Sequence, residues 1–227
     1  MTFNEGQYQL LYQQIVNGLN HAVSLVNHII HIVEDATSWI PFVGDAIKGE
    51  LDKLVAKMNQ FTQSVMQHLK AFEVPSYLNS FSGTWTGIEQ TTGNLASGIS
   101  GEAQTAGHTW AGVAGGAYQQ GVSNQAPAVS DINGLAASLS STAEGVANAG
   151  FVFFVAAGAA IVMLCIGLAG AELVFPAIAA IIAATLAIGG AYTNLRIQVS
   201  TNTRTLQGKL AGSSALPGGS WPLATAS

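Results

Sequence analysis

Charged residues are scarce in this chain. They make up only 8% of its 227 residues, against roughly 25% in an ordinary soluble domain. No lysine or arginine occurs between Lys70 and Arg196. Proteins hold nucleic acid phosphates and anionic lipid head groups with such cations. The central half of the chain is therefore not expected to bind an anionic lipid surface through its charges, and no nucleic acid partner is predicted.

Cysteine is nearly absent as well. Cys165 is the single one, which rules out an intrachain disulfide and leaves the redox compartment open. The first five residues carry no basic segment followed by an apolar one, so no cleaved signal peptide is expected there. If the protein leaves the cytoplasm, we expect a route other than general secretion.

Recognisable catalytic and metal-binding motifs are missing too. No serine lies in a nucleophile elbow with a recognisable base, and residues 112–116 lack the strand and the lysine of a phosphate loop. His21, His28 and His31 share a broad helical face, but their spacing is looser than a zinc site requires, so a solvated polar face is the simpler interpretation. Glu172, alone between two apolar runs, is either an intramembrane acid or, as we prefer, a water-facing residue at a hairpin tip. We expect a protein that is not an enzyme and has no metal or cofactor.

What the chain does contain is long helical periodicity. Apolar residues recur every three or four positions over residues 5–34 and again over residues 45–72, as on the buried stripe of an amphipathic helix. Pro75 is expected to end the second helix, with the next one beginning at Ser76. The sequence therefore predicts an N-terminal helical hairpin over residues 1–74.

A second hairpin is centred on Trp110-Ala111-Gly112. A heptad-like seam runs through residues 78–106 before this turn and through residues 118–146 after it, which predicts two antiparallel helices packed along their length. The glycine-rich first arm, with Leu95 among its seam residues, is expected to be the more dynamic one. Pro127 is expected to kink the second arm, a helix over 113–148. The whole hairpin is predicted to span residues 75–150.

Two apolar runs follow. Residues 151–170 and 173–191 are each close to the roughly 20 residues that cross a bilayer as a helix, and their many Gly and Ala residues allow close helix contacts. We predict a helical hairpin over residues 151–192, a helix continuation over 193–210 and a flexible tail over 211–227. The residues predicted to form the membrane hairpin are Phe151, Phe153, Phe154, Ile161, Leu164, Leu168, Phe175, Ile178, Ile181, Ile182, Leu186 and Ile188.

The predicted fold is therefore all-α. It consists of long antiparallel helical hairpins in a bundle, with an apolar helical hairpin rich in Ala and Gly.

With these features the chain resembles the Trp-x-Gly (WXG) superfamily of type VII (ESX-type) secretion substrates, and is most similar to its longer actinobacterial members. The similarity covers about residues 75–210. The residues that carry it are Pro75 to Leu78, Trp110 to Ala114, Ala117, Tyr118, Val122, Gln125, Ala128, Ile132, Leu139 and Ala143.

The resemblance implies helical hairpins that pair with another WXG-like protein or with a second copy, and export without a cleaved signal peptide. It also implies recognition of the Trp-x-Gly turn by the secretion machinery. This role carries over to Trp110 and Gly112, and Tyr118 completes the recognition turn that we predict. The family's Tyr-x-x-x-Asp/Glu export signal is missing, because Val122 follows Tyr118 and Arg196 follows Tyr192 at that spacing. Either a partner supplies the signal or the chain is not exported.

Four interpretations of the apolar hairpin stay open. The first is a type VII secretion-associated effector, carrier or adaptor with a membrane-active hairpin, secreted or associated with the cell envelope or membrane. The second is an α-helical pore-forming toxin or component, whose soluble bundle covers the hairpin until it inserts. The third is a soluble five- or six-helix bundle that buries the hairpin, because Gly- and Ala-rich helices also pack well inside soluble proteins. The fourth is an integral protein with two membrane spans.

Overall fold

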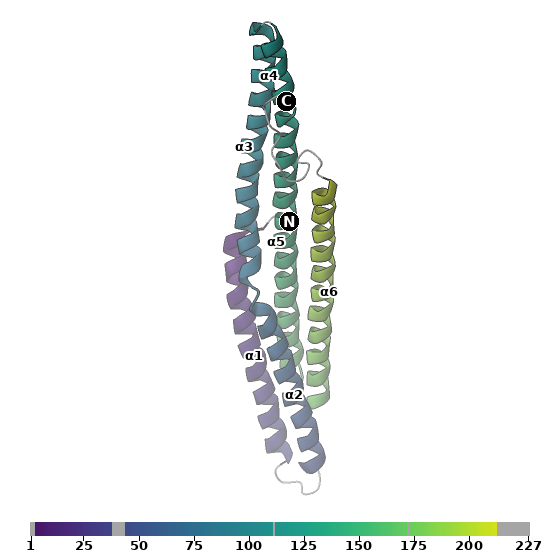
Figure 1. Cartoon of the computed structure of the whole chain (residues 1–227). Helices are drawn as coiled ribbons and strands as arrows, with labels where there is room; N and C mark the ends of the chain where they lie inside the picture. Colours follow the sequence, from purple (N-terminus) through teal and green to yellow (C-terminus); the bar gives the residue numbers. More distant parts are fainter. Residues whose placement is uncertain (1–2, 38–43, 111, 172, 213–227) are drawn as a thin grey trace. The chain divides into compact units, whose positions relative to one another are not determined.

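The computed structural model describes residues 3–37, 44–110, 112–171 and 173–212. The helices formed by these residues are α1 (Glu5–Thr37), α2 (Gly44–Leu69), α3 (Glu73–Thr109), α4 (Val113–Ser123), α5 (Gln125–Ala169) and α6 (Val174–Gly212), as labelled in Figure 1. The predicted all-α class is confirmed. The chain divides into two compact units, one of Met1–Ser76 with Ala147–Gln198 and one of Tyr77–Val146 with Val199–Ser227.

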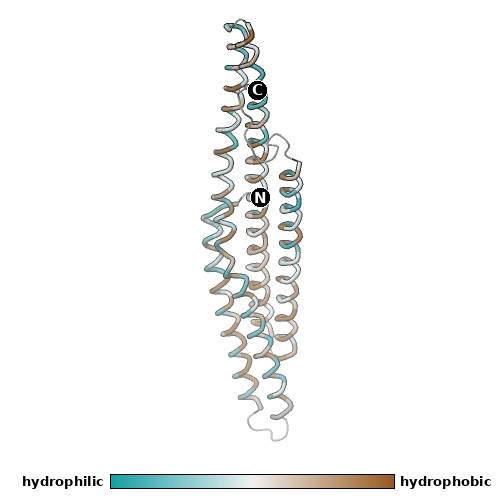
Figure 2. The backbone as a smooth tube through the Cα atoms, viewed as in Figure 1, coloured by the Kyte–Doolittle hydropathy of each residue, from teal (hydrophilic) through white to brown (hydrophobic). Residues whose placement is uncertain are grey.

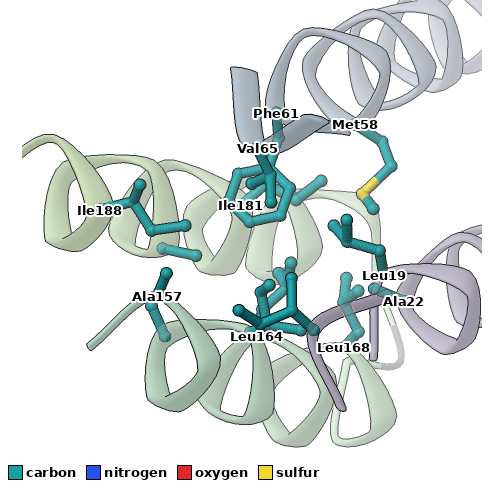
Figure 3. Packing of buried hydrophobic residues seen from close by; sticks show 14 of the residues in the cluster. Leu19, Ala22, Met58, Phe61, Val65, Ala157, Leu164, Leu168, Ile181 and Ile188 are labelled. Carbon is teal, nitrogen blue, oxygen red and sulfur yellow. The ribbon is translucent and has the colours of Figure 1, made fainter. Parts of the chain in front are cut away.

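In the first unit, α1 and α2 pack on the apolar stretches of α5 and α6. The stripe predicted on the first two helices is buried, with Leu19 of α1 and Phe61 of α2 at most 3% exposed. In Figure 3, side chains from α1, α2, α5 and α6 point toward one another, among them Leu164 and Ile181. The amphipathic pair therefore contributes half of a four-helix core, and the apolar hairpin contributes the other half.

The helix after the Trp110 turn is divided, which corrects a prediction. The sequence predicts one kinked helix over 113–148, but α4 ends at Ser123 and α5 begins at Gln125. In a continuous helix the ring of Pro127 would clash with the carbonyl of Ser123, four residues earlier. The chain breaks ahead of the proline, which then lies in the first turn of α5, where a missing N–H leaves no helical bond unmade.

Pro75 follows the same rule and corrects a second prediction. The helix expected to begin at Ser76 begins instead at Glu73. Pro75 lies in its first turn, where proline is tolerated.

The helices of the structure run across the ends of the predicted segments, and α6 includes the helix continuation predicted over 193–210. Residue 150 lies inside α5, and residue 192 lies inside α6, which continues to Gly212. Residues 38–43 between the first two helices, Glu172, and residues 213–227 of the predicted tail lie outside the described residues.

In the second unit, α3 pairs antiparallel with α5 through a partly polar seam. The hydroxyls of the buried Ser82 and Ser140 are 3.0 Å apart, and the hydroxyl of Thr86 is 2.8 Å from that of Ser140. Further along, the side-chain amide of Asn133 donates to the carbonyl of Glu89. Residue numbers therefore rise along α3 where they fall along α5, so the two helices run antiparallel, as the sequence predicts.

Leu95 was predicted in this seam, and that prediction is wrong. The side chain is 53% exposed, while its neighbour Ala96 is partly buried. An α-helix has 3.6 residues per turn, so its inward face drifts relative to a strict heptad spacing over several turns. By the seventh turn of α3 this drift has moved the inward position from Leu95 to Ala96.

Candidate functional site: the apolar hairpin and the Trp110 turn

The inner side of the apolar hairpin, residues 151–191 of α5 and α6, faces α1 and α2. The predicted hairpin residues that are buried there are Phe151, Phe153, Phe154, Ile161, Leu164, Leu168, Ile181 and Ile188, and Ile178 is partly buried. Three of the predicted residues, Phe175, Ile182 and Leu186, are exposed instead. The predicted set is therefore divided between a protein-facing and an outward-facing side.

The outer side carries large apolar side chains that the sequence-based list omitted. These are Val152, Val155, Val162, Met163, Ile166 and Leu173. Met163 is 67% exposed, and Leu186, on the same side, is 70% exposed. In α5 the omitted residues lie at intervals of three, seven, one and four positions, on the helix face half a turn from the buried stripe, and this second stripe was the signal that could have found them. In Figure 2 the stretches of α5 and α6 within the hairpin lack the hydrophilic turns seen on α1 and α2.

The hairpin meets the composition of a membrane span. No charged residue occurs over 145–171 or over 173–195. Both helices are long and apolar enough to cross a bilayer, and only 44% and 28% of their most apolar windows are buried. A core helix of a soluble protein passes the same test of length and composition, but such a helix is mostly buried. Less than half of each window here is covered by protein.

Glycine allows the close approach of α1 to α5. A Cβ added at Gly18 would lie 2.6 Å from Cγ2 of Ile161, far inside van der Waals contact. The thiol of Cys165 donates a weak hydrogen bond to the carbonyl of Gly18, with 3.4 Å between sulfur and oxygen. The lone cysteine of the chain thus contributes to packing on the inner side.

An aromatic cluster holds one end of the hairpin. Tyr8 of α1 stacks on Phe72, with 4.1 Å between ring centroids and 3° between ring planes. The hydroxyl of Tyr8 donates to the carbonyl of Phe72 at 2.5 Å. The rings of Phe151 and Phe154 pack against the ring of Tyr8, with 6.0 and 5.8 Å between centroids. Burial, and secondly the carboxylate of Glu5, raise the pKa of Tyr8 far above its usual range. The phenol therefore remains a neutral donor that ties α1 to the end of α2.

His68 of α2 lies in the same region. Its ring is 5.3 Å from that of Phe153 on α5 and 4.6 Å from that of Tyr192 on α6, between centroids. Burial lowers the pKa of His68 from its usual value, because the protonated ring loses hydration among these aromatic groups. Neutral His68 therefore favours the attachment of α2 to the hairpin.

The Trp110 turn has a defined geometry. α3 ends at Thr109 and α4 begins at Val113, so the turn lies where the sequence predicts it. Gly112 has a φ of +96°, a conformation that side-chain-bearing residues rarely adopt. The Trp110 ring is 57% exposed and contacts Tyr118, with 5.3 Å between centroids. The structure brings the three residues of the predicted recognition turn together and leaves the indole accessible.

The other sequence candidates lie elsewhere. Trp85 is half-buried and packs on Phe81, with 5.9 Å between ring centroids. His21, His28 and His31 are exposed on α1. No group of three His, Cys, Asp or Glu side chains suited to a metal ion occurs within the described part of the chain.

Comparison of the chain with protein-family models, with curated proteins and with solved structures finds no match. The resemblance to the Trp-x-Gly superfamily therefore rests on the residues of the turn and its arms alone.

Proposed function

We propose that this protein is a membrane-inserting, non-enzymatic helical protein of the pore-forming kind. The observation that carries the proposal is the apolar hairpin, which is free of charge over 145–171 and 173–195, is covered by α1 and α2 on one side only, and exposes large apolar side chains on the other. A bilayer is the environment that solvates both sides of such a hairpin. In a soluble domain a surface of this kind stays in contact with water, at a cost in free energy.

Insertion requires that α1 and α2 leave the inner side. Lipid tails are about as apolar as leucine side chains, so exchanging the contacts of Leu164 or Ile181 with α1 and α2 for contacts with lipid changes the free energy little. The outer side, with Met163 and Leu186, gains by leaving water. Insertion is therefore favoured if the uncovered stripes of α1 and α2, with Leu19 and Phe61, are buried against each other or against the bilayer instead of water. Phe175, 68% exposed near the hairpin tip, is placed to enter the bilayer first.

The test is binding to liposomes of zwitterionic lipid and release of an entrapped dye. Wild-type protein is expected to float with the vesicles and to release dye. Ile182→Glu, in the middle of the second apolar run and 43% exposed, should reduce binding at least tenfold, since a carboxylate at the centre of a membrane helix costs roughly 2.5–3.5 kcal/mol. Leu10→Glu, a matched change at a 60% exposed leucine of α1, should bind as wild type. Wild-type protein that stays in the aqueous fraction would overturn the proposal, and binding without dye release would restrict the function to a carrier or adaptor that associates with membranes.

A second candidate function is favoured by the Trp110 turn. We propose that this turn is a recognition surface for type VII-like secretion machinery, in a chain that pairs with a WXG-like protein or with a second copy. The exposed indole, its contact with Tyr118 and the positive φ of Gly112 support this role. It would make the protein an exported one, without excluding membrane insertion.

The test is export from a host that carries a type VII system. Trp110→Ala and Gly112→Val are expected to reduce the amount of protein in the culture medium at least tenfold, because the first removes the exposed indole and the second strains the turn. Trp85→Phe, which keeps an aromatic ring in the packing position, should leave export unchanged. Equal export of all four proteins would argue against the role of the turn.

A further inference from the structure

The outer side of the apolar hairpin is larger than a soluble monomer ordinarily exposes. Its large side chains, each between 39% and 70% exposed, are Val152, Val155, Val162, Met163, Ile166, Leu173, Phe175, Ile182 and Leu186. Summed over α5, α6 and the turn between them, they expose on the order of 900 Å², whereas the largest apolar patch of a typical monomer is about 300–600 Å². In water such a surface is expected to be covered.

We propose that, before it meets a membrane, the outer side of the hairpin is covered by a second copy of this chain. The available area matches what a stable dimer needs, because each partner of a standard interface contributes about 800 Å². A two-fold contact would bury the same patch on both copies. The inference concerns the surface proposed above to enter lipid, and its role as a protected state before insertion rests on that proposed function.

The charge pattern favours self-association over a charged partner. No lysine, arginine, aspartate or glutamate occurs over 145–171 or 173–195, and Glu172 between them is the single charge, so two copies of the patch meet with at most this one like charge on each. A partner that binds through opposite charge finds only Glu172 on this stretch to pair with. The interface core of obligate dimers is likewise depleted in charged residues.

The spacing of the patch also suits pairing with itself. On α5, Val152, Val155, Val162 and Ile166 follow intervals of three, seven and four residues, with the small Ala159 completing the stripe. On α6, Gly189 and Gly190 have open space where a Cβ would be. Large side chains on one helix and small ones on the other provide the knobs and the gaps that interdigitating helices require.

The experiment measures the mass of the full-length protein in detergent-free buffer by light scattering and by sedimentation over a range of micromolar concentrations. We expect a dimer for wild type and for Leu10→Glu, the exposed apolar control on α1. Ile166→Glu, at a 61% exposed position of the patch, should weaken the dimer at least tenfold with unchanged helix content by circular dichroism. A monomeric wild type, or a dimer that Ile166→Glu leaves intact or that Leu10→Glu weakens equally, overturns the proposal.

Vesicle binding by the same wild-type preparation separates this inference from the proposed function. A dimer that enters liposomes supports both, and its binding rate per molecule should fall as the protein concentration rises, because the patch must be released first. A monomer that binds liposomes overturns the dimer and leaves membrane insertion standing. A dimer that stays in the aqueous fraction supports the dimer and overturns insertion.

Discussion

At the residue scale, the close packing on the inner side of the hairpin depends on a glycine that has no Cβ. Gly18 lets α1 approach Ile161 more closely than any residue with a Cβ would allow, while Gly49 of α2 has no atom within 4 Å of the place of a Cβ. Both are interior helix positions, where alanine is intrinsically better than glycine. Replacing glycine with alanine is therefore expected to destabilise the protein at Gly18 and to stabilise it at Gly49.

We expect Gly18→Ala to lower the free energy of unfolding by about 1–2 kcal/mol, because overpacking against Ile161 outweighs the gain in helix propensity. Gly49→Ala should raise it by about 0.5–1 kcal/mol. Chemical denaturation of both variants beside wild type measures the two shifts. A stabilising Gly18→Ala would mean that α1 and α5 do not pack as closely as described.

His68 gives the protein a pH dependence whose sign follows from its surroundings. Its pKa is lowered in the folded state from the usual 6.5, so the folded protein binds this proton less readily than the unfolded chain does. The contribution of neutral His68 to stability is complete above pH 6.5 and is lost as the pH falls toward the lowered folded-state value.

His68→Phe, which keeps a ring between Phe153 and Tyr192 but cannot be protonated, should therefore lose less stability than wild type on acidification below pH 6.5. Thermal denaturation of both proteins across this range measures the difference. If the stability of the two proteins fell equally with pH, burial would not be lowering the pKa of His68.

At the scale of elements, α3 and α2 differ in how they are held. The apolar residues of α2 are buried along its length, from Leu51 to Leu69. Among the described residues of α3, by contrast, the buried ones are Pro75 in its first turn and Ser82, whose hydroxyl bonds to another serine. Several glycines of α3, such as Gly83 and Gly87, have nothing near the place of a Cβ. The element with low helix propensity is thus also the one with little packing.

We expect the amides of α3 beyond Gly93 to exchange with deuterium at least tenfold faster than those of α2 between Leu54 and Val65, because few buried contacts oppose local opening. Hydrogen exchange followed by mass spectrometry measures both segments in one sample. Equal protection of the two would contradict this view of α3.

At the scale of the whole molecule, the two compact units have cores of different kinds. The first buries large side chains such as Phe61 and Ile161, and the second buries mainly small ones such as Ala136, Ala143 and Ser140. Burial of large apolar side chains contributes more to stability. The first unit is therefore expected to be the more stable one, even though α5 and α6 contribute residues to both.

We expect denaturation to proceed in two steps. In a Trp39→Phe/Trp221→Phe/Trp110→Phe background, the fluorescence of Trp85 reports on the second unit and should change at a lower denaturant concentration than the main loss of helix by circular dichroism. Coincident transitions would show that α5 and α6 couple the two units into one cooperative fold.

The sequence alone determined the helices and much of their inward faces. The stripes through Leu19 and Phe61, the turn at Trp110 and the apolar composition of the hairpin follow from local periodicity, because burial of one helix face imposes a repeat of three and four residues. The divided helix at Pro127 was also encoded locally, in the clash of proline with the carbonyl four residues before it, but a kink and a break are two answers to the same clash.

Only the tertiary structure decided which side of the hairpin is covered. Residues 151–191 are apolar all around, so periodicity alone did not separate Leu164, which α1 and α2 bury, from Met163, which stays exposed. The positions of neighbouring helices make that distinction, and they depend on contacts distant in sequence, such as Gly18 with Ile161 and Tyr8 with Phe72. The outer side, on which the membrane and dimer proposals rest, exists as a surface only because two amphipathic helices are enough to cover one side and not both.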